Sequence, residues 1–396
     1  DSWTIGDKLT VNYGVRLEKE DMPSMDEAHP DAAFTFDFFD KIAPRVGFAY
    51  DIKGDGNTKI FGSFGIYYDV MKVDMAVGAF GGLVWHDAWY DIGTLDWTQY
   101  LTAAGVMFTG DTSPVLGGQL YETINHRAPG WDRIQPDMKP YSKMELSLGF
   151  QKKLNDDLAF TARFMHHRIL NVIEDIGVEI GGTEYYYYGN PGSDWINEIY
   201  AQSAAGGYIP PGRTCPKPTR TYYAVQLSLD KKFSNNWLGG MSLTWSSLRG
   251  LISGLASSDE HGRQNPMVQR YFDLWFLHYD SQMNLLTGPL PTDRPLDLKF
   301  YGAYTFDFGL TLGFNGYAKT GTPVSSEFML NNQQGWYPNG RGDIGRSPFL
   351  WQLDLYAEYI IKLGGRMNLN LNANITNLTN NKIAQRVYNR LYANRY

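Results

Sequence analysis

Hydrophobic and polar side chains alternate one by one along much of the chain. Between positions 349 and 363 every odd position is apolar, while the even positions include the charged residues Asp354 and Glu358. Segment 367–375 repeats the alternation, and only a Gly-Gly-Arg turn at 364–366 separates the two. Because successive side chains of a strand point to opposite faces, each segment is predicted to be a two-faced strand, and the pair to be a hairpin.

The same unit recurs along the chain. We count about eleven strands with this period of two, each close to the length that a tilted membrane strand needs. The alternating residues that mark them lie at 9–17, 46–50, 60–68, 143–151, 158–164, 223–229, 237–245, 296–306, 310–314, 349–363 and 367–375.

The connections alternate in length. Short turns follow one end of the strands, and the connections at the other end run over roughly 21–40, 73–140, 171–218, 251–290 and 329–347. Short periplasmic turns and long extracellular loops are typical of outer-membrane barrels. The predicted fold is therefore all-β, a transmembrane antiparallel β-barrel. A soluble β-sandwich is the alternative, although its outward face would be polar, whereas here the apolar face carries bulky aromatic residues at both strand ends.

Closure of the barrel is a separate question. About eleven strands is an odd number, whereas single-chain bacterial barrels have even counts, and an open edge in lipid leaves backbone groups unpaired. We therefore expect residues 1–396 to be one partial barrel domain with further strands at both ends and no closing strand after Ile383.

Composition supports a membrane location and limits other functions. Of 396 residues, 15% are aromatic, with 27 Tyr and 11 Trp, the side chains that favour membrane interfaces. Mean hydropathy is −0.36, which a strand-spanning protein tolerates because lipid-facing and lumen-facing residues alternate. The net charge of −7 argues against nucleic acid as a partner. Cys215 cannot form an intrachain disulfide, and we expect an exposed loop thiol.

Several stretches resemble TonB-dependent outer-membrane receptors, in particular the Oar-like group. The resemblance rests on residues 1–16 (DSWTIGDKLTVNYGVR), 43–51 (APRVGFAYD), 61–69 (FGSFGIYYD), 340–346 (GRGDIGR) and 374–380 (NITNLTN). These motifs are individually short, but they cover both ends and most strands in the family's order. The long loops match nothing.

The resemblance implies a barrel of about twenty-two strands in a bacterial outer membrane, filled by a plug domain that this chain lacks. It also implies energised uptake of a nutrient, such as a peptide, carbohydrate or chelate, through TonB, ExbB and ExbD. A plug-less passive channel, and a structural protein that docks an extracellular partner through its loops, remain alternatives. In each case the surrounding lipid is a partner.

Two sets of residues are candidates for function. Aromatic residues displayed on long loops could capture an amphipathic ligand, or they could fill the core of the folded loops. They are Trp85, Trp89, Tyr90, Trp97, Trp131, Tyr186, Tyr188, Trp195, Trp336 and Tyr337. The second set is charged and is expected to face the lumen, in contact with the plug or with one another. It comprises Arg16, Arg45, Glu145, Arg163, Asp230, Asp297, Lys299, Asp354 and Glu358.

Other motifs indicate structure rather than chemistry. The acidic stretch 51–57 lacks the terminal Glu of a calcium loop, so a hairpin turn is predicted. His166 and His167 should point to opposite faces and cannot share a metal ion. Arg341-Gly342-Asp343 is expected to shape the last loop. We identify no nucleophile–base constellation, metal site or cofactor motif, so an enzyme is not predicted.

Overall fold

The computed structural model of the chain describes most of its length in two compact units. The described residues are 1–24, 31, 33–73, 75, 80, 84–92, 96, 99, 116–126, 130–180, 183–202, 214–254, 267, 270–330, 334–385, 387 and 390–391. The first unit comprises 1–20, 36–71 and 133–396, and the second comprises 21–35 and 72–132. Within the described residues, no helix combines the length and apolarity needed to cross a membrane.

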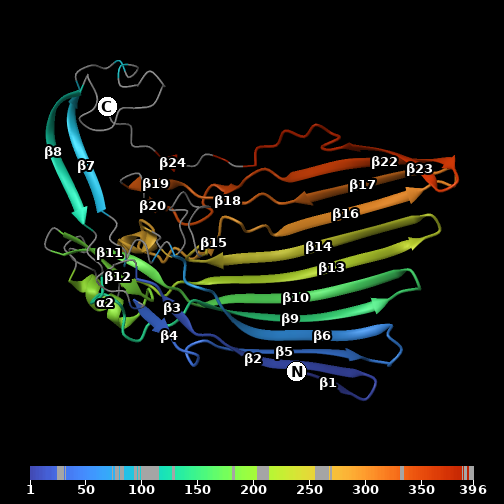
Figure 1. Cartoon of the computed structure of the whole chain (residues 1–396), viewed down its shortest axis with the longest axis horizontal. Helices are drawn as coiled ribbons and strands as arrows, with labels where there is room; N and C mark the ends of the chain where they lie inside the picture. The colour runs from blue at the N-terminus through green and yellow to red at the C-terminus, as the bar shows by residue number, and fades with distance from the viewer. Residues whose placement is uncertain are drawn as a thin grey trace. The chain divides into compact units, whose positions relative to one another are not determined.

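One large antiparallel sheet dominates the first unit, and twelve of its strands lie side by side in chain order (Figure 1). They are β1 (Ser2–Ile5), β2 (Leu9–Leu17), β5 (Ile42–Asp51), β6 (Thr58–Tyr68), β9 (Ser142–Lys153), β10 (Leu158–Asn171), β13 (Arg220–Ser234), β14 (Trp237–Gly250), β16 (Leu296–Thr305), β17 (Leu310–Lys319), β22 (Leu350–Gly364) and β23 (Met367–Ile375). The short β15 (Gly288–Pro289) pairs with the end of β14.

The strand count corrects one prediction. Eleven of the twelve strands coincide with predicted segments, and β1 is the additional one. It was left out of the strand count, but the first residues were expected to be the tail of a strand and residues 1–16 to resemble a family hairpin. That hairpin is confirmed, because β1 pairs with β2 from Ser2 opposite Asn12 to Ile5 opposite Leu9. The argument from an odd number of strands is therefore wrong.

Turn chemistry explains the short connections. In the β5–β6 turn the Asp51 carboxylate accepts hydrogen bonds from the backbone N–H groups of Lys53, Gly54 and Gly56, so the predicted hairpin turn is confirmed. Asn235 and Asn236 both have positive φ, at 49° and 68°, as a two-residue hairpin requires. All six short turns lie at one end of the sheet, the turn end, and the strand ends that the long connections join lie at the other, the loop end (Figure 1).

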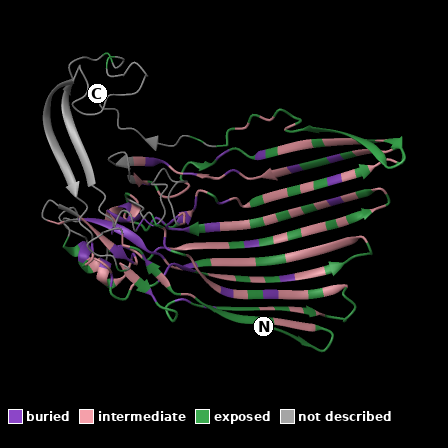
Figure 2. Cartoon of the chain, in the orientation of Figure 1, coloured by how far each residue is buried: buried purple, intermediate pink, exposed green. Residues whose placement is uncertain are grey.

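Strand register places the apolar residues of all twelve strands on one face, the apolar face. Leu243 of β14, for example, stands opposite Leu227 of β13 and Leu298 of β16. Many side chains on this face are exposed in the chain alone, and Trp245 is 66% exposed. Figure 2 shows the resulting alternation of exposed and partly covered positions along the strands. This two-faced sheet is the predicted fold.

Aromatic side chains border the apolar face near the turn end. Tyr304, Phe306 and Phe308 form a chain of ring contacts with centroids 4.8 and 5.4 Å apart, and Phe308 contacts Tyr359 of β22 at 6.5 Å. On β14, Trp237 lies at the turn end and Trp245 lies eight residues further along, roughly 27 Å at about 3.4 Å per residue. A band bordered by aromatics at this spacing matches the apolar core of an outer membrane.

The long connections and the segment after β23 contain small elements of their own, which the alternation did not predict. They are β3 (Glu20–Met22), β4 (Phe34–Phe36), β7 (Val84–Ile92), β8 (Leu116–His126), β11 (Glu174–Ile180), β12 (Thr183–Gly189), α2 (Asp194–Ala201), η4 (Arg270–Phe272), η5 (Trp275–His278), β18 (Pro323–Val324), β19 (Glu327–Leu330), β20 (Gln334–Trp336), β21 (Gly345–Arg346) and β24 (Arg390–Leu391).

The described residues of connections 172–219, 251–295 and 320–349 make up the loop layer. Its apolar side chains are buried, with Ile173, Ile176, Ile196, Phe272 and Leu277 all completely covered. Figure 2 shows buried residues gathered around β11 and β12. The loop layer therefore contains a hydrophobic core of its own.

Cys215 lies inside this core, so the expectation of an exposed thiol is wrong. It is 1% exposed, and its backbone N–H donates to Asn197 Oδ1 of α2 at 3.0 Å. Burial raises the pKa of the Cys215 thiol to about 12. A thiol behaves as a small apolar side chain when a folded loop packs around it, and this one stays protonated and inert.

In the second unit, β7 and β8 pair antiparallel, from Val84 opposite His126 to Ile92 opposite Leu116. Phe80 is fully buried. Its ring lies 6.0 Å from that of Phe34 and 5.4 Å from that of Trp131. An aromatic cluster therefore packs within this unit.

Candidate functional site

The nine charged candidate residues all lie on the polar face, opposite the apolar face. The register connects them strand by strand: Arg45 and Glu145 both stand opposite Gly65, and Arg163 stands opposite Gly149 of the strand that carries Glu145. The same parity places Arg16, Asp230, Asp297, Lys299, Asp354 and Glu358 on this face. His167 also lies there, opposite Glu145, whereas His166 stacks on Tyr223 on the apolar face at 4.4 Å, as predicted.

Charges on the polar face have close neighbours. Lys143 Nζ lies 2.7 Å from the Glu145 carboxylate and 5.7 Å from the centroid of the Tyr67 ring. The Arg45 guanidinium lies over the same ring at 4.6 Å. Such contacts, within one strand and between adjacent strands, satisfy charge on a surface that a closed barrel would enclose.

Further contacts involve five more of the nine residues. Arg163 lies over the Phe61 ring at 5.3 Å, and Lys299 Nζ is 3.6 Å from Asp297. Asp354 accepts hydrogen bonds from Gln352 Nε2 at 2.8 Å and from the backbone N–H of Asn377 at 2.7 Å. Arg16 pairs with Glu18.

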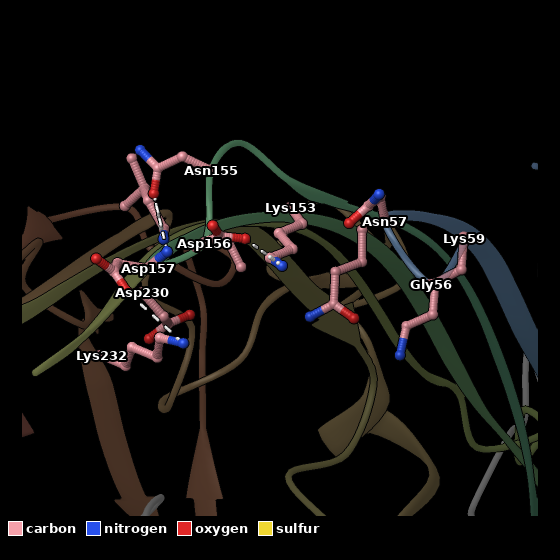
Figure 3. Close-up of a pocket in the computed structure, with 12 residues that line it drawn as sticks. Gly56, Asn57, Lys59, Lys153, Asn155, Asp156, Asp157, Asp230 and Lys232 are labelled. Carbon is pink, nitrogen blue, oxygen red and sulfur yellow. Dashed lines mark hydrogen bonds and ion pairs between the residues drawn. The ribbon is translucent and has the colours of Figure 1, made fainter. Parts of the chain in front are cut away.

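A polar cavity of about 360 Å³ opens on the polar face at the turn end (Figure 3). Its charged lining consists of three lysines and three aspartates, Lys59, Lys153, Lys232, Asp156, Asp157 and Asp230. Lys153 bonds Asp156 at 2.8 Å, and this bond lowers the pKa of Asp156. Lys232 lies 3.5 Å from Asp157. With equal numbers of opposite charges, the cavity suits a polar segment that carries both signs.

The aromatic candidates separate into two groups. Trp85, Trp89 and Tyr90 lie on β7 of the second unit. Trp131 packs in that unit, and Trp97 lies outside the described residues. The remaining five belong to the loop layer.

Within the loop layer, most of the candidate aromatics take part in packing. Tyr188 and Tyr337 are each 4% exposed. Trp336 donates its indole N–H to the Tyr279 carbonyl at 2.7 Å, and Tyr337 lies under the Arg341 guanidinium at 4.9 Å. These contacts favour the alternative in which loop aromatics form the core of the loops.

Arg341 of the Arg-Gly-Asp tripeptide joins two of the long loops. Its guanidinium donates to the carbonyls of Leu251 at 2.7 Å and Leu286 at 3.0 Å. Asp343 accepts a 2.7 Å hydrogen bond from the Ser326 backbone N–H. The tripeptide therefore shapes the last loop, as predicted.

Trp195 differs because it lines a cavity of about 450 Å³ at the loop end. The ring is partly exposed and packs edge-on against Tyr187 at 5.8 Å. Polar and charged side chains form most of the remaining wall. They are Gln135, Asp137, Lys139, Asn171, Asn190, Ser193, Asp194, Glu198 and Lys217.

The start of α2 fixes one wall of this cavity. Ser193 caps the helix by accepting a hydrogen bond from the Ile196 N–H at 3.3 Å. Asn190 donates its side-chain N–H groups to the carbonyls of Val172 at 2.7 Å and Lys139 at 2.8 Å. Trp195 was among the predicted site residues, whereas these polar residues were not. Their signal is the Asn-Pro-Gly-Ser-Asp run at 190–194, which has the composition of a turn followed by a helix cap.

An aromatic platform surrounded by amides and both signs of charge can bind a polar ligand with an apolar surface. The ring offers stacking area, and the amides and charges fix orientation. The volume falls in the range of small-molecule sites. The loop end thus offers a ligand cavity, and the turn end offers a polar docking cavity.

The geometry describes the wall of an outer-membrane barrel, and comparison with known proteins agrees. The family model for the outer membrane beta barrel domain matches residues 27–320, and the chain belongs to this family of bacterial outer-membrane proteins. It is 26% identical to the TonB-dependent transporter Oar of Myxococcus xanthus over 373 residues, 89% of this chain and 32% of Oar. The chain thus spans about a third of that relative.

Solved structures show the same fold. The outer membrane transporter YddB from Escherichia coli superposes with a TM-score of 0.58 at 13% identity, over 96% of this chain and 40% of YddB. The pyoverdine receptor FpvA from Pseudomonas aeruginosa PAO1 gives a TM-score of 0.50 at 11% identity, over 96% of this chain and 37% of FpvA. At these identities the likeness concerns architecture alone.

Proposed function

We propose that the chain forms part of the barrel wall of a TonB-dependent outer-membrane transporter that imports a nutrient. The observation that carries the proposal is the continuous two-faced sheet, combined with similarity to Oar along 89% of the chain. In this proposal the polar face, with its nine charged candidates, lines the lumen. The cavity around Trp195 is the extracellular contact for the nutrient.

The sheet edges support a larger barrel. Among the described strands, β1 pairs only with β2, and β23 pairs only with β22. An unpaired edge in lipid costs several kcal/mol for each unsatisfied backbone group. Further strands of the same protein are the proposed partners of both edges, and a plug domain is the proposed partner of the polar face.

The turn-end cavity of Figure 3 is the proposed contact for periplasmic coupling. Its turns face the periplasm if the long loops are extracellular, which is the arrangement of this class of barrel. The lysines and aspartates of the cavity would form ion pairs with the plug, and these ion pairs could break and form again. Movement of the plug by TonB would then open the lumen.

Uptake measurements on cells that produce the full-length protein test the proposal. Fluorescent peptides, oligosaccharides and ferric chelates are offered separately, with and without a protonophore that collapses the proton gradient. We expect one probe class to accumulate, and accumulation to stop with the protonophore, because TonB coupling requires that gradient. A passive channel would continue to admit the probe, and a structural protein would admit none.

Trp195→Ala locates the binding step. Loss of stacking should weaken surface binding of the accumulated probe by roughly tenfold, equivalent to about 1.4 kcal/mol. The matched control is Trp245→Ala, because Trp245 lies on the apolar face. Equal binding by both variants would exclude the Trp195 cavity as the contact.

A further inference from the structure

A hollow of about 680 Å³ opens in the apolar face between β13, β14, β16 and β17. Its floor is formed by Gly239 and Gly302, which stand opposite each other in the register of β14 and β16. Both strands therefore lack a side chain at the same level. The neighbouring pair toward the turn end is Trp237 opposite Tyr304, and the pair on the other side is Met241 opposite Phe300.

Aromatic packing maintains the hollow. A Cβ atom added at Gly302 would lie 2.8 Å from the Phe314 ring of β17, so a larger side chain at this position would have to displace that ring. The hollow is a slot with an apolar floor and aromatic walls. Its volume exceeds the lower limit for a small-molecule site.

The slot has one cation, and it lies on the turn side. Lys231 lines the hollow, and its ammonium lies 4.1 Å from the centroid of the Trp237 ring. It donates hydrogen bonds to the Ser234 hydroxyl at 2.7 Å and to the carbonyls of Ser234, Trp237 and Lys232 at 3.0, 3.1 and 3.2 Å. The positive charge therefore lies beside the aromatic border, whereas the glycine pair is two residues deeper, roughly 7 Å along the strand.

We propose that this slot binds an acyl chain of one phospholipid of the periplasmic leaflet, with the lipid phosphate beside Lys231. The occupant follows from continuity, because the apolar face of an outer-membrane barrel is covered by lipid along its whole width. Aromatic residues mark the level of the headgroups, and the slot lies below that level. The proposal depends on membrane location and not on the transported nutrient.

Native mass spectrometry of the full-length protein tests the site. Protein purified in detergent is delipidated and titrated with a palmitoyl-oleoyl phosphatidylethanolamine. Gly239→Leu fills the slot, and Leu229→Trp fills it from the β13 side if the first variant does not fold. Ala162→Leu is the matched control, because Ala162 lies on the apolar face opposite Phe150 and Leu227, outside the slot.

We expect one tightly held phospholipid in the wild type and in Ala162→Leu. Binding to the slot-filled variant should fall roughly tenfold, the loss expected when about two methylene groups are no longer buried. Equal retention by all folded variants would mean exchangeable boundary lipid only and would overturn the proposal, as would absence of phospholipid from the wild type.

Lys231→Met tests the headgroup contact. Removing one cation near the membrane surface should reduce the preference for phospholipid over diacylglycerol by about fivefold. An unchanged preference would refute the contact between Lys231 and phosphate.

Discussion

The apolar face of the sheet and the loop layer use the same kinds of side chain in opposite ways. On the sheet, Trp245 is 66% and Phe314 is 45% exposed, whereas Phe272 and Leu277 of the loop layer are completely buried. A loop in water must cover its apolar groups with its own chain, but a strand in a membrane can leave them to the lipid. The comparison therefore separates the part of the chain that folds in water from the part that folds in lipid.

The largest expected effect tests the water-facing core. Phe272→Ala removes a ring that packs 5.0 Å from His278, and it should destabilise the loop layer by about 3–5 kcal/mol. Hydrogen exchange should show faster exchange in the loops with little change in the strands. The control is Phe308→Ala, since Phe308 is 63% exposed and its removal should cost about 1 kcal/mol or less. Equal destabilisation by Phe272→Ala and Phe308→Ala would contradict the distinction between a water-facing core and a lipid-facing sheet.

A charge on the apolar face tests the lipid-facing part. Leu243→Arg places a cation in the middle of the apolar band and should destabilise the inserted barrel by about 2–4 kcal/mol. Ser242→Arg, one residue away on the polar face, should cost far less. Denaturant unfolding of the full-length protein in lipid vesicles measures both. A similar cost for the two variants would refute the assignment of the faces.

Acid should weaken the loop layer and not the sheet. Burial, with a smaller contribution from Arg341, lowers the pKa of His278 to about 3. The unfolded chain binds a proton below about pH 6.5 while the folded chain does not, so stability is full above that pH and falls below it.

The free energy of unfolding of the loop layer should fall by about 2 kcal/mol at pH 5 because of His278. Hydrogen-exchange protection of residues 271–286, corrected for intrinsic rates, gives the measurement. His278→Gln serves as the control, and most of the pH dependence of loop-layer stability should be lost in this variant. If loop-layer stability still fell with pH in the variant, a titratable group other than His278 would be responsible.

The smallest expected effect concerns the wall of the Trp195 cavity. Ser193→Ala removes the cap of α2 and should cost about 1 kcal/mol, with faster exchange of the Ile196 amide. The strands need no such cap because neighbouring strands satisfy their backbone groups. Ser281→Ala, at an exposed serine of the same layer, is the matched control. If Ser193→Ala and Ser281→Ala showed the same stability and the same exchange of the Ile196 amide, the cap would not stabilise the wall of the cavity.

Local alternation predicted the strands well because successive side chains of a strand point to opposite faces, one apolar and one polar. Eleven of the twelve side-by-side strands of the large sheet, the two-faced sheet and the alternation of short and long connections followed from that rule. The count of alternating segments left out the four residues of β1, although residues 1–16 resemble a hairpin of TonB-dependent receptors and the first residues read as the tail of a strand. The elements of the loops were missed because their residues carry no single period.

The sequence by itself determined the fold class and the membrane location of this protein. Period-two alternation, aromatic borders and turn residues are local signals, and they contain the necessary information. Only the tertiary structure decided that Cys215 is buried, that Tyr188 and Tyr337 serve as core, and that Trp195 shares a cavity with Lys139 and Lys217. It also brought Gly239 and Gly302 together. These outcomes depend on contacts between residues distant in the chain, which spacing along one strand or loop cannot specify.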